Sequence, residues 1–184
     1  MNNQLLLLLL VVAVVVIGIL VWMLTRKRRT EELRQHFGPE YERAVDEHGD
    51  RHEAEAALEA RERRVEQLQI RSLSSQDRER FAEAWKSVQA QFVDDPAGAT
   101  GEADRLVAEV MQTRGYPVGD FEQRADDISV DHPGVVENYR AAHKIAQRNE
   151  RGEADTEDLR KAMVHYRALF EELLEAGQPM EVRR

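Results

Sequence analysis

Histidines offer the most chemistry in this sequence, because the chain contains no cysteine. The absence of thiols excludes disulfide bonds, thiolate metal sites and a cysteine nucleophile. His48 and His52 are four residues apart and Glu55 follows, so on a continuous helix the three side chains would share one side and could bind a metal. The zinc-protease pattern, however, needs a second histidine at position 56, which is alanine, and Gly49 favours a helix break. We therefore interpret both as solvent-exposed histidines.

A second arrangement is Asp131-His132-Pro133, in which the carboxylate could hold the histidine as a general base. The preferred interpretation is a helix cap, with Asp131 accepting backbone N–H groups and Pro133 presetting the first helical turn. His143 and His165 lie within or beside apolar stripes. We expect each to be partly buried and hydrogen-bonded once, rather than to form an acid–base pair.

Other catalytic and cofactor-binding patterns are missing from the sequence. No histidine has an acidic residue three positions before it, which excludes the Glu-x-x-His pairs of di-iron bundles. The ten glycines form no phosphate-binding loop, and no Gly-x-Ser-x-Gly elbow occurs. We therefore expect a protein that is not an enzyme and has no cofactor. A histidine-based metal-binding protein or enzyme is the alternative.

The charge of the chain is unevenly distributed. Four of its 26 basic residues and none of its 35 acidic residues fall within the first 29, which leaves a formal charge of −13 on the rest. Nucleic-acid binding relies on Lys and Arg side chains that neutralise phosphates. A domain this acidic is not expected to bind nucleic acid.

Residues 5–24 form an apolar run without a charged side chain. A helix rises about 1.5 Å per residue, so this run would span roughly 30 Å, the thickness of a bilayer's hydrocarbon core. A cleaved signal peptide would need a basic start, a shorter apolar run and small residues at a cleavage site, none of which is present. The sequence predicts a transmembrane anchor over residues 1–29, with a secreted helical protein as the alternative.

The predicted membrane-interface residues are Trp22, Arg26, Lys27, Arg28 and Arg29. The positive-inside rule places the four basic residues, and the domain that follows them, on the cytoplasmic side of the inner membrane. The basic cluster could also bind anionic lipid headgroups, at about 1 kcal/mol per residue. The preferred interpretation is that it acts only as a topology signal.

Residues 30–73 are predicted to form a charged stalk helix and a linker. Gly38-Pro39 interrupts the chain early, and residues 40–69 are rich in Glu, Arg and Ala, which favour helix. The apolar stripe of this segment is thin, and Gly49-Asp50 could break the helix. We expect a stalk that buries too little to order itself, or a weak coiled coil with another copy.

Residues 74–184 carry most of the large apolar residues and are predicted to form a small bundle of about four helices. Ser74 and Asp77 have the spacing of a capping box at its start. No stretch alternates with a period of two, so strands are not expected and the predicted fold class is all-α. The clearest amphipathic stripe, at helical spacing, is Phe81, Trp85, Val88 and Phe92.

The loop that contains Arg114, Tyr116, Pro117 and Phe121 is unusually apolar. Such residues must either pack against the bundle or contact a partner. Packing against the bundle is the preferred interpretation. If any surface of the chain is a docking site, this loop is the one that the sequence indicates.

Four short runs resemble a family of uncharacterised bacterial proteins that have one N-terminal membrane span. The resemblance covers roughly residues 37–174, and it implies no activity, cofactor or catalytic residue. The runs are Phe92-Val93-Asp94-Asp95-Pro96, Arg114-Gly115-Tyr116-Pro117, Asp131-His132-Pro133 and His165-Tyr166-Arg167. The leading hypothesis is a non-enzymatic helical module that the lipid bilayer tethers and that binds a protein partner or itself.

Overall fold

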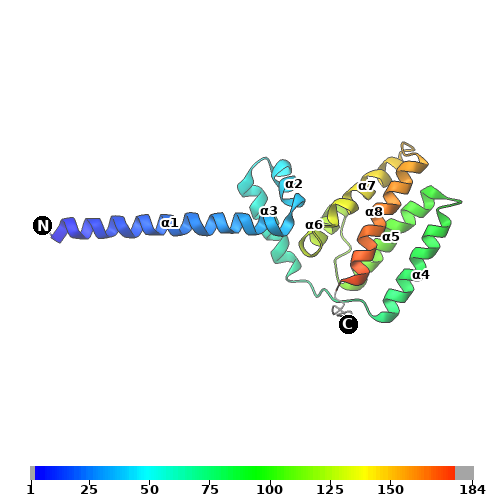
Figure 1. Cartoon of the computed structure of the whole chain (residues 1–184), viewed down its shortest axis with the longest axis horizontal. Coiled ribbons are helices and arrows are strands. Elements are labelled where there is room, and N and C mark those ends of the chain that lie inside the picture. The colour runs from blue at the N-terminus through cyan, green and yellow to red at the C-terminus, as the bar shows by residue number, and fades with distance from the viewer. Residues whose placement is uncertain (1–2, 177–184) are drawn as a thin grey trace, which may run out of the picture. The chain divides into compact units, whose positions relative to one another are not determined.

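A computed structural model describes residues 3–176 of the chain, apart from the side chains of residues 3–9, 11, 14 and 15. Helices make up all of its regular structure and no strand occurs among the described residues, so the chain is all-α as predicted. Figure 1 shows the helices in chain order. They are α1 (Asn3–Phe37), α2 (Pro39–His48), α3 (Arg51–Val65), α4 (Ser75–Gln91), α5 (Pro96–Arg114), α6 (Phe121–Asp131), α7 (Val136–Glu150) and α8 (Thr156–Glu175).

The chain divides into two compact units, Met1–Leu58 and Glu59–Arg184. In the first unit, α1 continues unbroken through the basic cluster. Gly38, with φ of +53°, separates α1 from α2, and Pro39 begins α2. Gly49 has φ of +69° and donates its N–H to the Val45 carbonyl, which ends α2. Both interruptions predicted for this segment are therefore present.

The segment expected to be a thin stalk contributes a small apolar core to the first unit. Tyr41 donates its hydroxyl to the Glu55 carboxylate at 2.9 Å, which links α2 to α3. Helix α1 supplies Leu33 and Phe37 to this core from its part beyond the basic cluster. Six apolar side chains of this unit are fully buried: Leu33, Phe37, Tyr41, Ala44, Ala54 and Leu58.

As far as the described residues reach, no helix combines the length and the apolar character needed to cross a membrane. The predicted span at residues 5–24 includes residues 5–9, 11, 14 and 15, whose side chains lie outside the described part. The structure therefore does not support the transmembrane helix, which stays a prediction.

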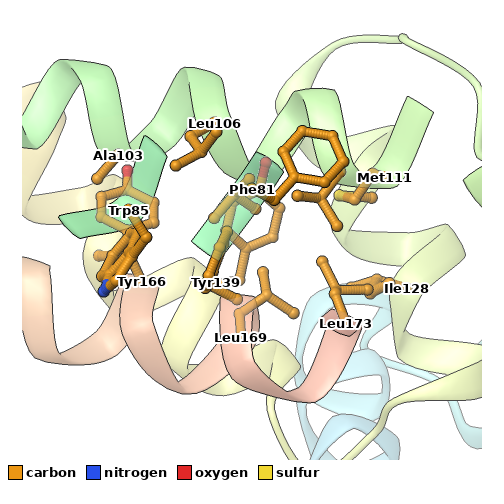
Figure 2. Packing of buried hydrophobic residues seen from close by; sticks show 14 of the residues in the cluster. Phe81, Trp85, Ala103, Leu106, Met111, Ile128, Tyr139, Tyr166, Leu169 and Leu173 are labelled. Carbon is orange, nitrogen blue, oxygen red and sulfur yellow. The ribbon is translucent and has the colours of Figure 1, made fainter. Parts of the chain in front are cut away.

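The second unit contains the end of α3, a linker and five helices, α4 to α8. The bundle has one helix more than predicted, because the short segment after Asp120 forms α6, which extends to Asp131. Helix α8 packs against α5 and α7, and α4 packs against α5. Figure 2 shows the buried side chains of these helices meeting in one cluster, to which α8 contributes Tyr166, Leu169 and Leu173.

Side-chain caps begin four of the five helices of the bundle, and the cap predicted at Ser74 is among them. The Ser74 hydroxyl accepts from the Asp77 N–H at 3.0 Å, and Asp95 accepts from the Gly98 N–H at 2.9 Å. Asp120 and Asp155 cap α6 and α8 in the same way. Each of these caps satisfies a backbone N–H of the first helical turn that has no partner within the helix.

Gly115 ends α5 at a point where the linker passes close by. Its φ is +104°, and a Cβ there would lie 2.5 Å from the Gln69 carbonyl oxygen. The Arg71 N–H donates to the Arg114 carbonyl at 2.8 Å. Only glycine combines this backbone conformation with so close an approach. The linker is thereby held against the end of α5, beside the loop that the sequence singles out.

Candidate functional site

The histidine pair at positions 48 and 52 does not share a helix face. His48 is the last residue of α2 and His52 lies in the first turn of α3, and both are exposed. Glu55, the third member of the hypothetical metal site, is buried and accepts the Tyr41 hydroxyl. In the part of the chain that the structure describes, no group of three His, Asp or Glu side chains is arranged to hold a metal ion.

The structure corrects the interpretation of Asp131 as a helix cap. Asp131 is the last residue of α6, and its carboxylate accepts a hydrogen bond from the Tyr116 hydroxyl at 2.6 Å. Helix α7 begins only at Val136, and its N-cap residue makes no side-chain capping hydrogen bond. Because α6 extends to Asp131, the Asp-His-Pro run ends one helix and does not open the next.

His132 is buried between the buried Arg114 and the exposed Glu172. Its Nε2 lies 3.2 Å from Nη1 of Arg114, and its Nδ1 lies 3.0 Å from Oε1 of Glu172. Arginine can only donate, so Nε2 accepts and Nδ1–H donates to the carboxylate. The lone pair that a general base needs is therefore occupied. These three side chains connect the ends of α5, α6 and α8.

The loop from Arg114 to Phe121 packs mainly against the bundle, as the preferred interpretation expected. Arg114 is 5% exposed and Tyr116 is 2% exposed. Burial and the hydrogen bond to Asp131 raise the pKa of Tyr116 well above its ordinary value. Pro117 is half-buried, and Phe121 stacks on the His143 ring with centroids 3.5 Å apart. Val118, at 59% exposure, is the large apolar residue of the loop that reaches solvent.

A layer of polar side chains also crosses the bundle core. The Tyr139 hydroxyl accepts a hydrogen bond from Nε of Arg124 at 3.0 Å. Burial, followed by the negative charge of Asp104, raises the pKa of Tyr139 to about 12. The same two causes raise the pKa of Tyr166 further. Both phenols are therefore neutral at neutral pH, and neither supplies a phenolate base.

His143 and His165 lie at the edge of the bundle core. Each is half-buried with one side-chain hydrogen-bond partner, Gln147 at 3.1 Å and Asn138 at 2.8 Å respectively. Burial lowers the pKa of His143. The expectation for these two histidines is confirmed, and they come from different helices with different partners.

A shallow apolar groove of about 170 Å³ lies between α4 and α8, and we call it the α4–α8 groove. Val164 on its rim is 55% exposed, whereas Trp85 at its base is buried and stacks on Phe170 with centroids 4.7 Å apart. Two arginines at the rim, Arg160 and Arg167, pair with acids of their own helix. The groove is lined by Trp85, Gln89, Phe92, Arg160, Met163, Val164 and Arg167.

A larger groove of about 480 Å³ lies in the first unit, between α1 and the start of α3, and we call it the α1–α3 groove. Three of the predicted membrane-interface residues line it, namely Trp22, Arg26 and Lys27. Arg28 is exposed but does not line the groove, and Arg29 pairs with Glu32 at 3.6 Å. The remaining lining residues are Met23, Thr30, Asp50, Arg51, His52 and Glu55.

Sequence reasoning missed the two residues that complete these grooves, Arg51 and Val164. Arg51 joins the basic cluster from another helix, and Val164 lies outside the buried face of α8. No local pattern marks either residue. No family model, curated protein or solved structure matches the chain.

Proposed function

We propose that this chain is a non-enzymatic, membrane-tethered helical module whose bundle binds a protein partner. The observation that carries the tether is a set of exposed apolar side chains on α1. Ten large apolar residues between positions 10 and 24 are each at least 48% exposed. Contiguous apolar surface of this kind is unfavourable in water and marks a contact with membrane or protein.

A lipid bilayer is the environment that best suits this part of α1. The run at residues 5–24 contains no charge, and it is followed at once by Arg26, Lys27, Arg28 and Arg29. Basic residues directly after an apolar segment favour a cytoplasmic location for the chain that follows them. We therefore place the bundle at the cytoplasmic face of the inner membrane.

The partner surface that we propose is the α4–α8 groove. Its apolar lining comes from Trp85, Phe92, Met163 and Val164, and its rim carries Arg160 and Arg167. The ion pairs of these two arginines are exposed, and exposed pairs are weak enough to exchange partners. The occupant that fits is an apolar segment of another protein with acidic residues beside it.

The tether and its orientation are tested with single cysteines, because the natural chain has none. Asn3→Cys and Lys86→Cys are labelled in intact cells with a membrane-impermeant maleimide. We expect Asn3→Cys to react in intact cells and Lys86→Cys to react only after lysis. Labelling of Lys86→Cys in intact cells would show that the bundle lies outside the cell. Extraction of the protein from membranes by carbonate would rule out the transmembrane tether.

The groove is tested with a photo-crosslinking amino acid at Gln89, an exposed residue on its rim. We expect one discrete heterologous adduct that Val164→Glu abolishes. The matched control is Val118→Glu, which places the same charge at a similarly exposed valine in the apolar loop. Loss of the adduct only with Val118→Glu would make the loop the docking surface, and an adduct of two identical chains would indicate self-association.

A further inference from the structure

We infer that the α1–α3 groove binds the phosphate headgroup of an anionic phospholipid. This inference rests on the proposed tether, because the lipid must reach the groove from the bilayer that surrounds α1. It adds a specific ligand and a binding residue, Arg51, to a basic cluster that the sequence alone interprets as a topology signal.

Three cations meet in the groove: Arg26 and Lys27 from α1, and Arg51 from the first turn of α3. None of the three forms an ion pair with a carboxylate among the described residues. Arg26 instead lies over the Trp22 ring, 5.2 Å from its centroid. Arginine and lysine side chains without protein partners are the natural ligands of a phosphate oxygen.

The two acids that line the groove are already engaged in the fold. Asp50 accepts the backbone N–H groups of His52 and Glu53, at 2.8 and 3.0 Å, and so caps α3. Glu55 is 9% exposed and accepts the Tyr41 hydroxyl. The acids therefore hold α3 in position, while the cations stay available to a ligand. The formal charge of the lining is +1, with histidine neutral.

The rest of the lining favours a lipid over a free phosphate. Trp22 and Met23 are 58% and 57% exposed, and they belong both to the apolar surface of residues 10–24 and to the lining of the groove. A tryptophan ring at this position suits the boundary between acyl chains and headgroups. A lining that combines apolar side chains with three cations suits an amphipathic ligand whose phosphate lies at the membrane surface.

Trp22 also reports on occupancy. The full-length chain is reconstituted in nanodiscs that contain phosphatidylcholine and phosphatidylglycerol. Two samples are compared, one with brominated acyl chains on phosphatidylcholine and one with brominated acyl chains on phosphatidylglycerol, because bromine quenches tryptophan fluorescence. The second tryptophan, Trp85, is 6% exposed within the bundle core and gives a constant background. We expect quenching of Trp22 to indicate that phosphatidylglycerol is enriched about fivefold near this residue relative to its fraction in the bilayer. A fivefold enrichment corresponds to a binding preference of about 1 kcal/mol.

Arg51→Gln is the decisive variant, since Arg51 is exposed and lies outside the juxtamembrane cluster. We expect it to abolish the lipid preference, and Arg51→Lys to keep it. Arg28→Gln is the matched control, because it removes the same charge from the basic cluster but not from the groove. The preference of Arg28→Gln for phosphatidylglycerol should remain close to that of the natural chain.

Each other outcome overturns a distinct statement. Equal quenching by both lipids, or equal losses in Arg51→Gln and Arg28→Gln, would reject the headgroup site and leave the tether intact. Displacement of the preference by soluble glycerol phosphate would assign the groove to a free phosphate. No quenching by either lipid would overturn the tether itself, and the headgroup site with it.

Discussion

The Arg114 guanidinium donates to Nε2 of the His132 imidazole at 3.2 Å, in a part of the bundle that is almost closed to solvent. The direction of this bond requires the proton of the neutral imidazole to sit on Nδ1, where it faces Glu172 at 3.0 Å. Arg114 also donates to the Leu173 carbonyl at 3.4 Å. One buried arginine thus sets the tautomer of a histidine and satisfies the end of α8.

Arg114→Ala is expected to lower the free energy of unfolding by about 3 kcal/mol, because it leaves the His132 nitrogen and the Leu173 carbonyl without donors. Urea denaturation of the full chain, followed by circular dichroism, measures this loss. Arg105→Ala on the exposed side of the same helix should change the value by no more than about 0.5 kcal/mol. Equal losses in both variants would contradict the structural role of Arg114.

Gly115→Ala is expected to destabilise the chain by about 2 kcal/mol or more. The substitution forces an alanine into φ of +104° and places its Cβ 2.5 Å from the Gln69 carbonyl oxygen. Gly101→Ala is the contrasting change, because Gly101 lies within α5 and its added Cβ would meet no atom within 4 Å. Thermal unfolding should show a gain of up to about 1 kcal/mol for Gly101→Ala. A gain for Gly115→Ala would show that the linker does not pass this close.

The stability of the chain should decrease as the pH is lowered, and His143 should contribute part of this decrease. Burial holds the pKa of His143 below its ordinary value of 6.5 in the folded chain. In the unfolded chain His143 binds a proton more readily than in the folded chain. The free energy of unfolding therefore falls as the pH is lowered from 6.5 to the depressed pKa of the folded chain. His143→Gln should flatten this part of the pH–stability profile. An unchanged slope in the variant would assign the dependence to other groups.

Phe37→Ala tests the small core of the first unit. Phe37 is fully buried, and its truncation should destabilise this unit by about 3–5 kcal/mol. Hydrogen exchange of the full-length chain in detergent should then show loss of protection across α2 and the start of α3. Gln35→Ala, at an exposed position of the same helix, should leave protection unchanged. Absence of protection in the natural chain would favour the disordered stalk that the sequence suggests.

Helix starts and ends were predictable because the interactions that make them are local. Ser74 and Asp95 bind amide groups three residues further on, and Gly49 ends a helix by its own backbone conformation. Asp131 shows the limit of this reasoning. Its sequence neighbours make it resemble an N-cap, but its partner is Tyr116, 15 residues away. A residue that can cap a helix can equally accept a hydrogen bond from a distant side chain.

The candidate sites were less predictable than the helices. The sequence indicates Trp22 and the basic cluster, but the cluster gains its groove only when α3 brings Arg51 to it. The sequence indicates the apolar loop as a candidate docking surface. In the structure, two residues of that loop, Arg114 and Tyr116, are buried. The exposed apolar surface of the bundle instead includes Val164, on a helix whose opposite face forms the core.

By itself, the sequence determined the all-α class, the cap at Ser74, the helix breaks, the apolar run at residues 5–24 and the basic cluster that follows it. These features depend on side chains within a few residues of one another, or on composition alone. Only the tertiary structure decided that Leu33 and Phe37 join a core, that Arg114 reaches His132 and that Arg51 and Arg26 line the same groove. Each of these relationships depends on how helices pack, and packing couples residues that no local pattern connects.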